Sequence, residues 1–381
     1  MIKEFHSRLD QFRVDRPGLQ VSGRVASVDA LRGFDMFWII GGEAVFRSLE
    51  NVFISGDAGF ISRQLTHVEW TGFRFYDLIM PLFLFIVGVA MPFSFRKRLE
   101  KVPSKAAMWP HILKRLIVLW ILGMAVQGNL LDYDWNKIKF FSNTLQAIAC
   151  GYLIASILML YCRVTWQIAG TLVLMLIYWA LLTFVPVPGF GSGIITPEGN
   201  FAIFVDKFIL GKFQDGTTYS WIVSSLNFGA TVMLGVFSGY LLQSGLKAGK
   251  KITWLIVAGL TLIILGKIWG IWHPSVKHIW TSSFVLFSGG ICMLLLALFL
   301  FLVDKLDLKK SFLFFTIIGM NAIFAYCASH LFDFGQVADV FVGGLKGSTG
   351  AVYYFLRALG GFGVLYFILW LMYKYRIFIK I

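Results

Sequence analysis

The sequence predicts an all-α membrane protein that crosses the bilayer about ten times, with both ends of the chain in the cytoplasm. Of its 381 residues, 58% are hydrophobic and 14% are charged, whereas a soluble domain is roughly 45–50% apolar and about 25% charged. Its apolar runs have the length of spanning helices, which is about 20 residues. Lys and Arg gather between alternate runs, as they do in the cytoplasmic loops of membrane proteins.

The apolar runs define the predicted spans in order. The first begins behind a charged segment, the second ends where the sequence turns basic, and two prolines close the fifth. We expect residues 1–26 to form a cytoplasmic N-terminal segment without a cleavable signal peptide, and residues 27–375 to form a single transmembrane domain. The predicted spans are 33–52, 75–95, 109–128, 143–162, 166–185, 221–243, 252–272, 280–303, 311–331 and 350–373.

The net charge of +14 has a topological explanation. Because the basic residues cluster at one side of the predicted membrane, they set orientation and indicate no nucleic-acid partner. The four cysteines lie in or beside apolar runs without the spacing of metal ligands, so we expect packing roles and no metal. The outer loop 186–220 contains a helical pattern, 201–210, that predicts a segment at the membrane interface.

The stretch from Ser27 to Pro92 concentrates ionisable residues in apolar surroundings. Such groups are costly at membrane depth and are therefore candidates for function. His67 is a candidate general base, or a packed histidine at the interface. Glu43 is a candidate to orient His67, accept a proton or bind a cationic amine, or it simply reaches water.

Three more charged residues share one helix face at the start of this stretch. Asp29, Arg32 and Asp35 follow one another at intervals of three, which favours an ion-paired cluster over direct ligand contact. Asp77 has the same spacing from Arg74 and could pair with it.

The remaining polar candidates lie farther along the chain. His330, with Asp333 three residues on, is a reserve base, whereas His273 and His278 are expected to be solvated in a short outer loop. Polar side chains inside later spans either hydrogen-bond between helices or line a polar passage. These side chains are Asn143, Gln146, Asn227, Ser282, Ser283 and Asn321.

Several motifs then resemble one family. SVDALRGFDMF followed by HVEWTGFRFYDLIMPLFLFIVGVAMPFS resembles the transmembrane acyltransferases of the heparan-α-glucosaminide N-acetyltransferase family and their bacterial relatives. NTLQAIACGYL, PEGNFAIFVDKFILG, WTSSFVLFSGG and IIGMNAIFAYCASHL resemble later motifs of that family. The resemblance covers about residues 24–375.

The resemblance implies that acetyl passes from cytosolic acetyl-CoA to the amine of a glucosamine-type sugar on the outer side, in a bacterial cytoplasmic membrane. The family's active-site histidine corresponds to His67 and its motif aspartate to Asp77. Two departures are Glu43, where lysosomal members have asparagine, and Ala147, where the family often has arginine.

Some binding roles rest on the residues themselves: basic side chains on the predicted inner side attract the phosphates of CoA, although topology alone also accounts for them, and a tryptophan at a membrane interface is likewise ordinary. Acetyl-CoA is expected to contact Arg96, Lys97, Lys114 and Gln146, and the amino-sugar acceptor is expected to contact Asp77, Trp70, Asp29, Arg32 and Asn321.

Several alternatives stay open at this point. His67 either deprotonates the amine for direct transfer or forms an acetyl-histidine intermediate. The chain could also be a multi-pass solute transporter or an O-acetyltransferase of an envelope polysaccharide. The residues do not decide whether it forms a homodimer.

Overall fold

The computed structural model describes residues 25–54, 59–102 and 104–379. These residues form helices, joined by loops that hold two isolated β-bridges, Thr71–Val276 and Val187–Gly191. The predicted N-terminal segment lies outside the described residues up to residue 24. The α-helices are α2 (Ala26–Phe37), α3 (Glu43–Phe53), α4 (Phe60–Gln64), α5 (Ile79–Leu99), α6 (Trp109–Gln127), α7 (Thr144–Tyr161), α8 (Val164–Phe184), α9 (Phe201–Leu210), α10 (Ser225–Gln243), α11 (Ala248–Trp269), α12 (Ser282–Phe299), α13 (Leu313–Met320), α14 (Ala322–Leu331), α15 (Phe334–Val342) and α16 (Ala351–Lys374).

The described residues contain eight helices that are long and apolar enough to cross a membrane. A ninth span results if α13 and α14, which meet at an angle of 76°, are counted as one broken span. The all-α polytopic fold is therefore confirmed. Eight of the predicted spans correspond to these long helices, and the predicted span 311–331 corresponds to the bent pair.

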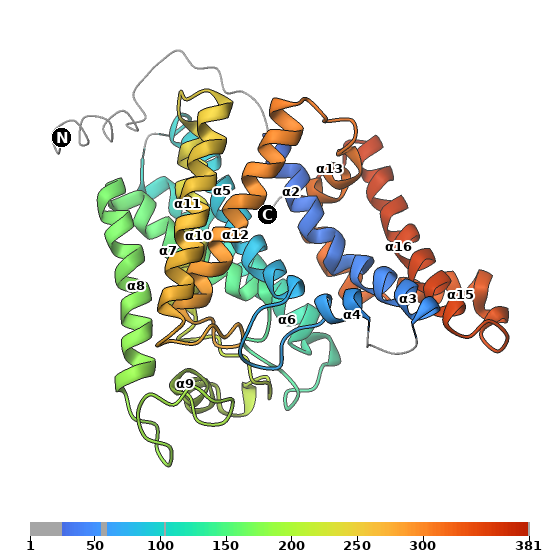
Figure 1. Cartoon of the computed structure of the whole chain (residues 1–381), viewed down its shortest axis with the longest axis horizontal. Coiled ribbons are helices and arrows are strands. Elements are labelled where there is room, and N and C mark those ends of the chain that lie inside the picture. The colour runs from blue at the N-terminus through green and yellow to red at the C-terminus, as the bar shows by residue number, and fades with distance from the viewer. Residues whose placement is uncertain (1–24, 55–58, 103, 380–381) are drawn as a thin grey trace.

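The first predicted span, 33–52, is wrong as a continuous helix. A π-helical turn, Trp38–Gly42, separates α2 from α3, and Gly41 inside this turn has a φ of 140°. Glycine adopts this conformation without the steric penalty that a side chain would bring. The chain consequently changes direction at Gly41, and α3 runs sideways from the end of α2 (Figure 1).

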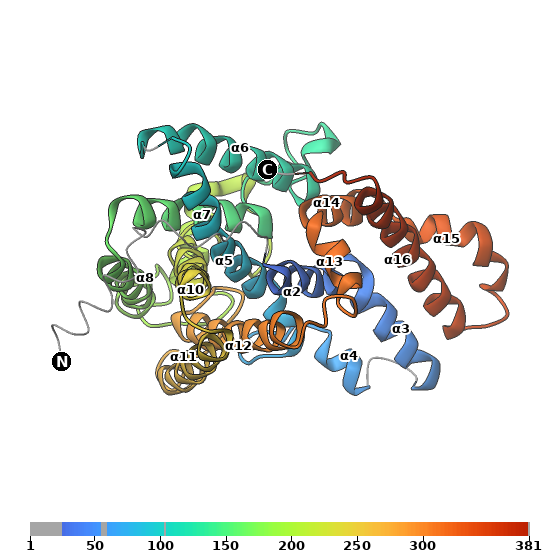
Figure 2. The same cartoon turned by 90° about the horizontal axis from the view of Figure 1, so that it is seen from above.

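The helices form two groups. Figure 2 shows α5, α7, α8, α10, α11 and α12 together on one side and α3, α15 and α16 on the other, with α2 and α13 between them. α5 and α10 are the most buried of the long helices and occupy the centre of the first group.

Small residues allow the central helices to approach closely. A Cβ atom on Gly33 of α2 would lie 1.6 Å from the carbonyl oxygen of Phe315, and one on Gly319 of α13 would lie 2.1 Å from that of Asp29. Gly88 of α5 and Gly235 of α10 are in the same relation. Helix pairs in membranes commonly pack in this way, because dispersion contacts there replace the hydrophobic effect as the driving force.

The two ends of the bundle are distinguished by α12 and its continuation. α12 begins directly after the loop 270–281, and Asp304, in the π-helical turn Leu300–Lys305 that continues α12, accepts a hydrogen bond of 2.6 Å from Ser27. The continuous helical segment Ser282–Lys305 has 24 residues, which corresponds to about 36 Å at 1.5 Å per residue. We call the end with loop 270–281 the loop end and the end with Ser27 the basic end, since Arg96, Lys97 and Lys114 also lie there.

Candidate active site

The loop end brings together three segments that are far apart in the sequence. The segment 65–74, which precedes α5, forms a bridge with loop 270–281 between Thr71 and Val276. Gly72 reinforces it with a main-chain hydrogen bond of 3.1 Å to Ser275. The Trp70 indole donates to the carbonyl of Ile195, in the loop 186–220, at 2.9 Å. These contacts hold His67 in a defined position at the end of α5.

His67 and Asp77 form a hydrogen-bonded pair. His67 Nδ1 lies 2.8 Å from Asp77 Oδ1, and the Asp77 side chain is fully buried. The other carboxylate oxygen, Oδ2, accepts the main-chain N–H groups of Arg74 at 2.9 Å and Val68 at 3.4 Å. Since a carboxylate accepts hydrogen bonds, the pair places the proton of neutral His67 on Nδ1 and leaves a lone pair on Nε2.

The predicted ion pair between the Arg74 and Asp77 side chains is not formed. The Arg74 guanidinium instead donates to Thr66 Oγ1 at 2.9 Å and to the carbonyl oxygen of His67 at 3.1 Å. The spacing of three residues serves a different purpose, because Asp77 caps the helical turn that begins beside Arg74.

Lys277 completes the group and was missed by the sequence analysis. Its Nζ lies 2.8 Å from His67 Nδ1, 3.1 Å from His67 Nε2 and 3.6 Å from Asp77 Oδ1. The Lys277 side chain is only 4% exposed, whereas that of His67 is 38% exposed. A signal was present in the sequence, since Lys277 lies in a loop that was predicted to be on the outer side, where the distribution of basic residues makes lysine unusual.

The ionisable groups of this site have shifted proton affinities. Burial, together with the charge of Lys277, lowers the pKa of His67, while the hydrogen bond that His67 donates to Asp77 acts in the opposite direction. Burial lowers the pKa of Lys277 to about 8, against the opposing effect of Asp77. At neutral pH the group therefore consists of an unprotonated imidazole between a carboxylate and an ammonium.

Aromatic side chains surround this group. Tyr219 stacks on His278 with ring centroids 4.3 Å apart, and Trp70 meets the same imidazole edge-on at 5.5 Å. Tyr76 packs against His67 at 4.9 Å. This wall of rings is a surface on which the apolar face of a sugar can stack.

The two histidines of loop 270–281 are less exposed than predicted. His278 is half-buried, with Nδ1 2.7 Å from Thr218 Oγ1, and burial lowers its pKa to about 4. His273 is fully buried, and burial lowers its pKa to about 4 as well. The loop folds inward under its bridge to Thr71, so a short loop between two spans did not mean a solvated one.

Glu43 lies near this group without joining it by a hydrogen bond. Its carboxylate forms an ion pair of 2.7 Å with Arg47, one turn later on α3. Asp77, rather than Glu43, orients the imidazole, which corrects the first of the roles considered for Glu43. Its negative charge still acts on His67 at longer range and raises the pKa of that group.

The cluster at the start of α2 lies at the opposite end of the bundle. Asp29 and Arg32 form the expected ion pair at 3.4 Å, two and five residues after Ser27. Since Ser27 binds Asp304, beyond the end of α12, the length of that helix separates the pair from loop 270–281. The structure therefore does not bring Asp29 and Arg32 to His67. Asp35 is buried, and neither of its carboxylate oxygens has a hydrogen-bond partner among the described residues.

The residues expected to contact acetyl-CoA have different environments. Arg96 pairs with Glu100 at 3.0 Å, and Lys97 and Lys114 are exposed at the basic end. Gln146 is buried, and its amide binds the main chain of Ser142 at 2.9 Å and Phe140 at 2.6 Å. Its role is local, because those bonds close the turn that precedes α7.

Asn321 lies at the bend between α13 and α14. Its amide donates to the carbonyl of Ile377 and accepts the N–H of Ile379, each at 3.0 Å. It therefore fastens the C-terminal segment, and the structure gives it no contact with the His67 group.

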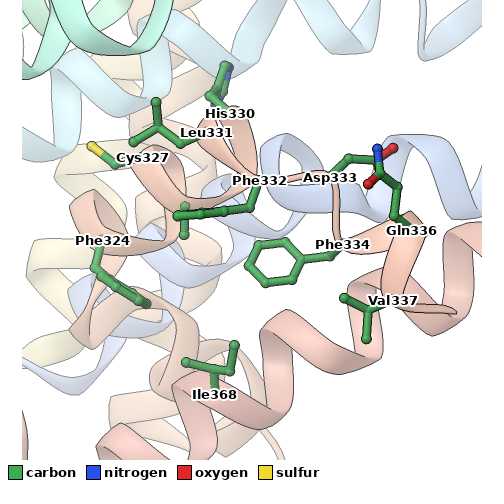
Figure 3. A pocket seen from close by; sticks show the side chains of 11 residues that line it. Phe324, Cys327, His330, Leu331, Phe332, Asp333, Phe334, Gln336, Val337 and Ile368 are labelled. Atoms are coloured by element: carbon green, nitrogen blue, oxygen red, sulfur yellow. The ribbon is translucent and has the colours of Figure 1, made fainter. Parts of the chain in front are cut away.

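An open, largely apolar hollow lies among α14, α15 and α16 (Figure 3). His330, the reserve base, and Asp333 line it, but their side chains are bonded to other groups. His330 Nδ1 lies 2.9 Å from the carbonyl oxygen of Tyr326, while Asp333 pairs with Arg357 at 2.7 Å. No three His, Cys, Asp or Glu side chains are grouped as metal ligands in the described part of the chain.

Comparison with known proteins gives two mammalian relatives. The chain is 24% identical to the heparan-alpha-glucosaminide N-acetyltransferases of Mus musculus and Homo sapiens, over 70% of this chain and 49% of each relative. It thus spans about half the length of the curated relatives it matches. No protein-family model matches the chain. The two matches support a distant family resemblance, as the motifs predicted.

Proposed function

We propose that this chain is a membrane-embedded N-acetyltransferase, which uses acetyl-CoA to acetylate the amine of a glucosamine-type sugar. The observation that carries the proposal is the group of His67, Asp77 and Lys277, in which Asp77 holds the imidazole through Nδ1 and the lone pair of neutral His67 lies on Nε2, 3.1 Å from Lys277 Nζ. The distant resemblance to two N-acetyltransferases supports the reaction class.

In the proposed reaction, the acceptor amine attacks the carbonyl carbon of the thioester. His67 Nε2 takes the proton that the amine nitrogen loses, and the Asp77 carboxylate stabilises the resulting imidazolium through Nδ1–H. The C–S bond then breaks, and the CoA thiolate leaves with the proton returned from His67. The products are the amide and free CoA.

A covalent version uses the same atoms in another order. His67 Nε2 first attacks the thioester, and the C–S bond breaks to give acetyl-imidazole and the CoA thiolate. The amine then attacks the acetyl carbon, the bond from that carbon to Nε2 breaks, and the proton that the amine loses passes through Nε2 to solvent, which balances the proton that the thiolate takes up. Because Nε2 carries the lone pair in both versions, the geometry serves either one.

The two ends of the bundle suit the two substrates. Arg96, Lys97 and Lys114 place positive charge at the basic end, which attracts the phosphates of acetyl-CoA. Trp70, Tyr219 and His278 place rings beside His67 at the loop end, where the sugar would bind. The proposal therefore has the donor and the acceptor approach from opposite sides of the membrane.

The test is transfer of labelled acetyl from acetyl-CoA to glucosamine by purified protein in detergent, with CoA release measured in parallel. We expect His67→Ala to lower the rate by about 10²- to 10⁴-fold, the usual contribution of a general base. His330→Ala is the matched control, since His330 bonds to a main-chain carbonyl beside the apolar hollow. Wild-type protein that acetylates no amino sugar and releases no CoA would refute the proposal.

A further inference from the structure

Lys277 is a buried cation with a fixed position. Side chains of α8 and α10 hold its loop, because the Tyr178 hydroxyl donates to the carbonyl of Ile279 and Asn227 donates to that of Trp280 at 2.7 Å. The bridge between Val276 and Thr71 fastens the same loop to the segment that carries His67. The backbone from which the Lys277 side chain extends is therefore held beside His67 by several hydrogen bonds.

The charges around His67 balance only when the imidazole is neutral. Asp77 and Lys277 carry one charge of each sign, 3.6 Å apart, and both side chains are buried. The other charged groups that face His67 are paired or bonded elsewhere: Glu43 with Arg47, and Arg74 with Thr66 and the main chain of His67. Tyr76, Tyr219 and His278 are further titratable neighbours among the described residues: Tyr76 packs against His67, the Tyr219 ring lies 6.0 Å from Lys277 Nζ, and burial lowers the pKa of His278 to about 4. A proton on His67 would leave the buried group with a net positive charge.

We infer that Lys277 is the positioning residue that keeps His67 unprotonated. Its ammonium supplies the positive charge beside the Asp77 carboxylate that a protonated His67 would otherwise supply. The inference rests on the proposed function, in which His67 must start without a proton on Nε2. Without Lys277, the negative charge of Asp77 would be balanced only if His67 took up a proton and became the neighbouring cation. The base would then hold its proton before the amine arrived.

The ionisation of Lys277 is compatible with this role. Its pKa, lowered by burial to about 8, leaves the ammonium as the main form at pH 7. A nearby charge of the same sign commonly shifts a pKa by about one to three units. Since His67 is partly exposed, we expect a shift at the lower end of that range.

The test is an NMR titration of histidine-labelled protein in detergent, with His67→Gln used to assign the His67 signal. We expect Lys277→Met to move the His67 midpoint upward by about one pH unit, in the direction set by loss of a neighbouring cation. Lys277→Arg, which keeps the charge, should leave the midpoint within a few tenths of a unit. An unchanged midpoint in folded Lys277→Met would overturn the inference, and Lys277→Gln provides a second neutral variant if the first does not fold.

The rate of acetyl transfer supplies the second readout. In Lys277→Met the rate should fall by no more than about threefold at pH 7, by up to about tenfold at pH values below the wild-type His67 midpoint, and not at all toward pH 9, because a shift of one unit in the base changes its unprotonated fraction by the full factor only below both midpoints. A merely structural role would instead lower the rate equally at every pH. If wild-type protein transfers no acetyl but the His67 midpoint still moves, the charge role stands and the proposed function fails.

Discussion

Replacing Asp77 by asparagine tests whether the carboxylate sets the proton position on His67. Asp77 Oδ2 accepts two main-chain N–H groups, from Arg74 and Val68. In Asp77→Asn these donors select the amide oxygen, so the NH₂ group must face His67 Nδ1, which lies 2.8 Å from the carboxylate. An NH₂ group needs an acceptor there, and the imidazole proton consequently moves to Nε2.

The magnitude follows from the loss of the Nε2 lone pair. The equivalent change in a Ser-His-Asp triad lowers kcat by about 10⁴-fold because the wrong tautomer is held. For this site we expect a loss of about 10³- to 10⁴-fold, which corresponds to about 4 to 5.5 kcal/mol of activation free energy. KM for the amino sugar should change little, since Asp77 is fully buried and has no surface open to substrate.

The assay is acetyl transfer under saturating acetyl-CoA, with thermal unfolding in the same detergent as the measure of folding. Asp206→Asn is a matched control, because Asp206 is also buried and accepts two main-chain N–H groups, from Trp221 at 2.6 Å and Ile222 at 3.0 Å. If Asp77→Asn keeps more than a tenth of the wild-type rate, the hydrogen bond does not control the tautomer of a catalytic His67.

Three further perturbations have expected outcomes. Gly33→Ala should destabilise the protein by about 3 kcal/mol or more, since its Cβ would lie 1.6 Å from a carbonyl oxygen of α13; Gly363→Ala, which meets nothing within 4 Å, is the control, and equal thermal midpoints would contradict the packing. Glu43→Gln should slow acetyl transfer by less than about tenfold, because Glu43 is bonded to Arg47 and acts on the base only through its charge; a loss as large as that of His67→Ala would give it a direct role. His273→Gln should reduce the loss of folding stability that wild-type protein shows in acid. Burial lowers the pKa of His273 to about 4, so below pH 6.5 the unfolded chain gains a proton that the folded chain refuses, a loss of about 2 kcal/mol at pH 5. Thermal midpoints at pH 7.5 and pH 5 measure this effect, and an equal drop in variant and wild type would contradict it.

Much of the fold could be predicted from hydropathy, because a membrane restricts the chain to helices of one length. Hydropathy does not show where a helix changes direction, however, and both predicted spans that proved to be broken, 33–52 and 311–331, contain such a change. The turn at Gly41 and the bend at Asn321 interrupt apolar runs without changing their composition. Membrane helices tolerate such interruptions when neighbouring groups satisfy the freed backbone, and local sequence does not show those neighbours.

Two of the three residues of the candidate site could be predicted from the sequence. His67 and Asp77 stand ten residues apart, and both were singled out as ionisable groups beside apolar runs. Lys277 follows His67 by 210 residues, so only the folded loops bring it within hydrogen-bond distance. Asp29 and Arg32 lie near His67 in the sequence and were predicted to contact the same substrate. In the structure, the length of a membrane helix separates them from His67.

The way in which loop 270–281 is fastened has a consequence for divergence. The side chains that fix it, Tyr178, Ser224 and Asn227, bind the carbonyl oxygens of Ile279 and Trp280 rather than their side chains. Every residue type offers the same carbonyl, but both side chains are buried, and the Trp280 indole also donates to Thr231 Oγ1 at 3.0 Å, so packing fixes these two positions as well. Variation in the loop is therefore confined to exposed positions such as Ile271 and Trp272, while its buried part keeps the ammonium of Lys277 beside the imidazole.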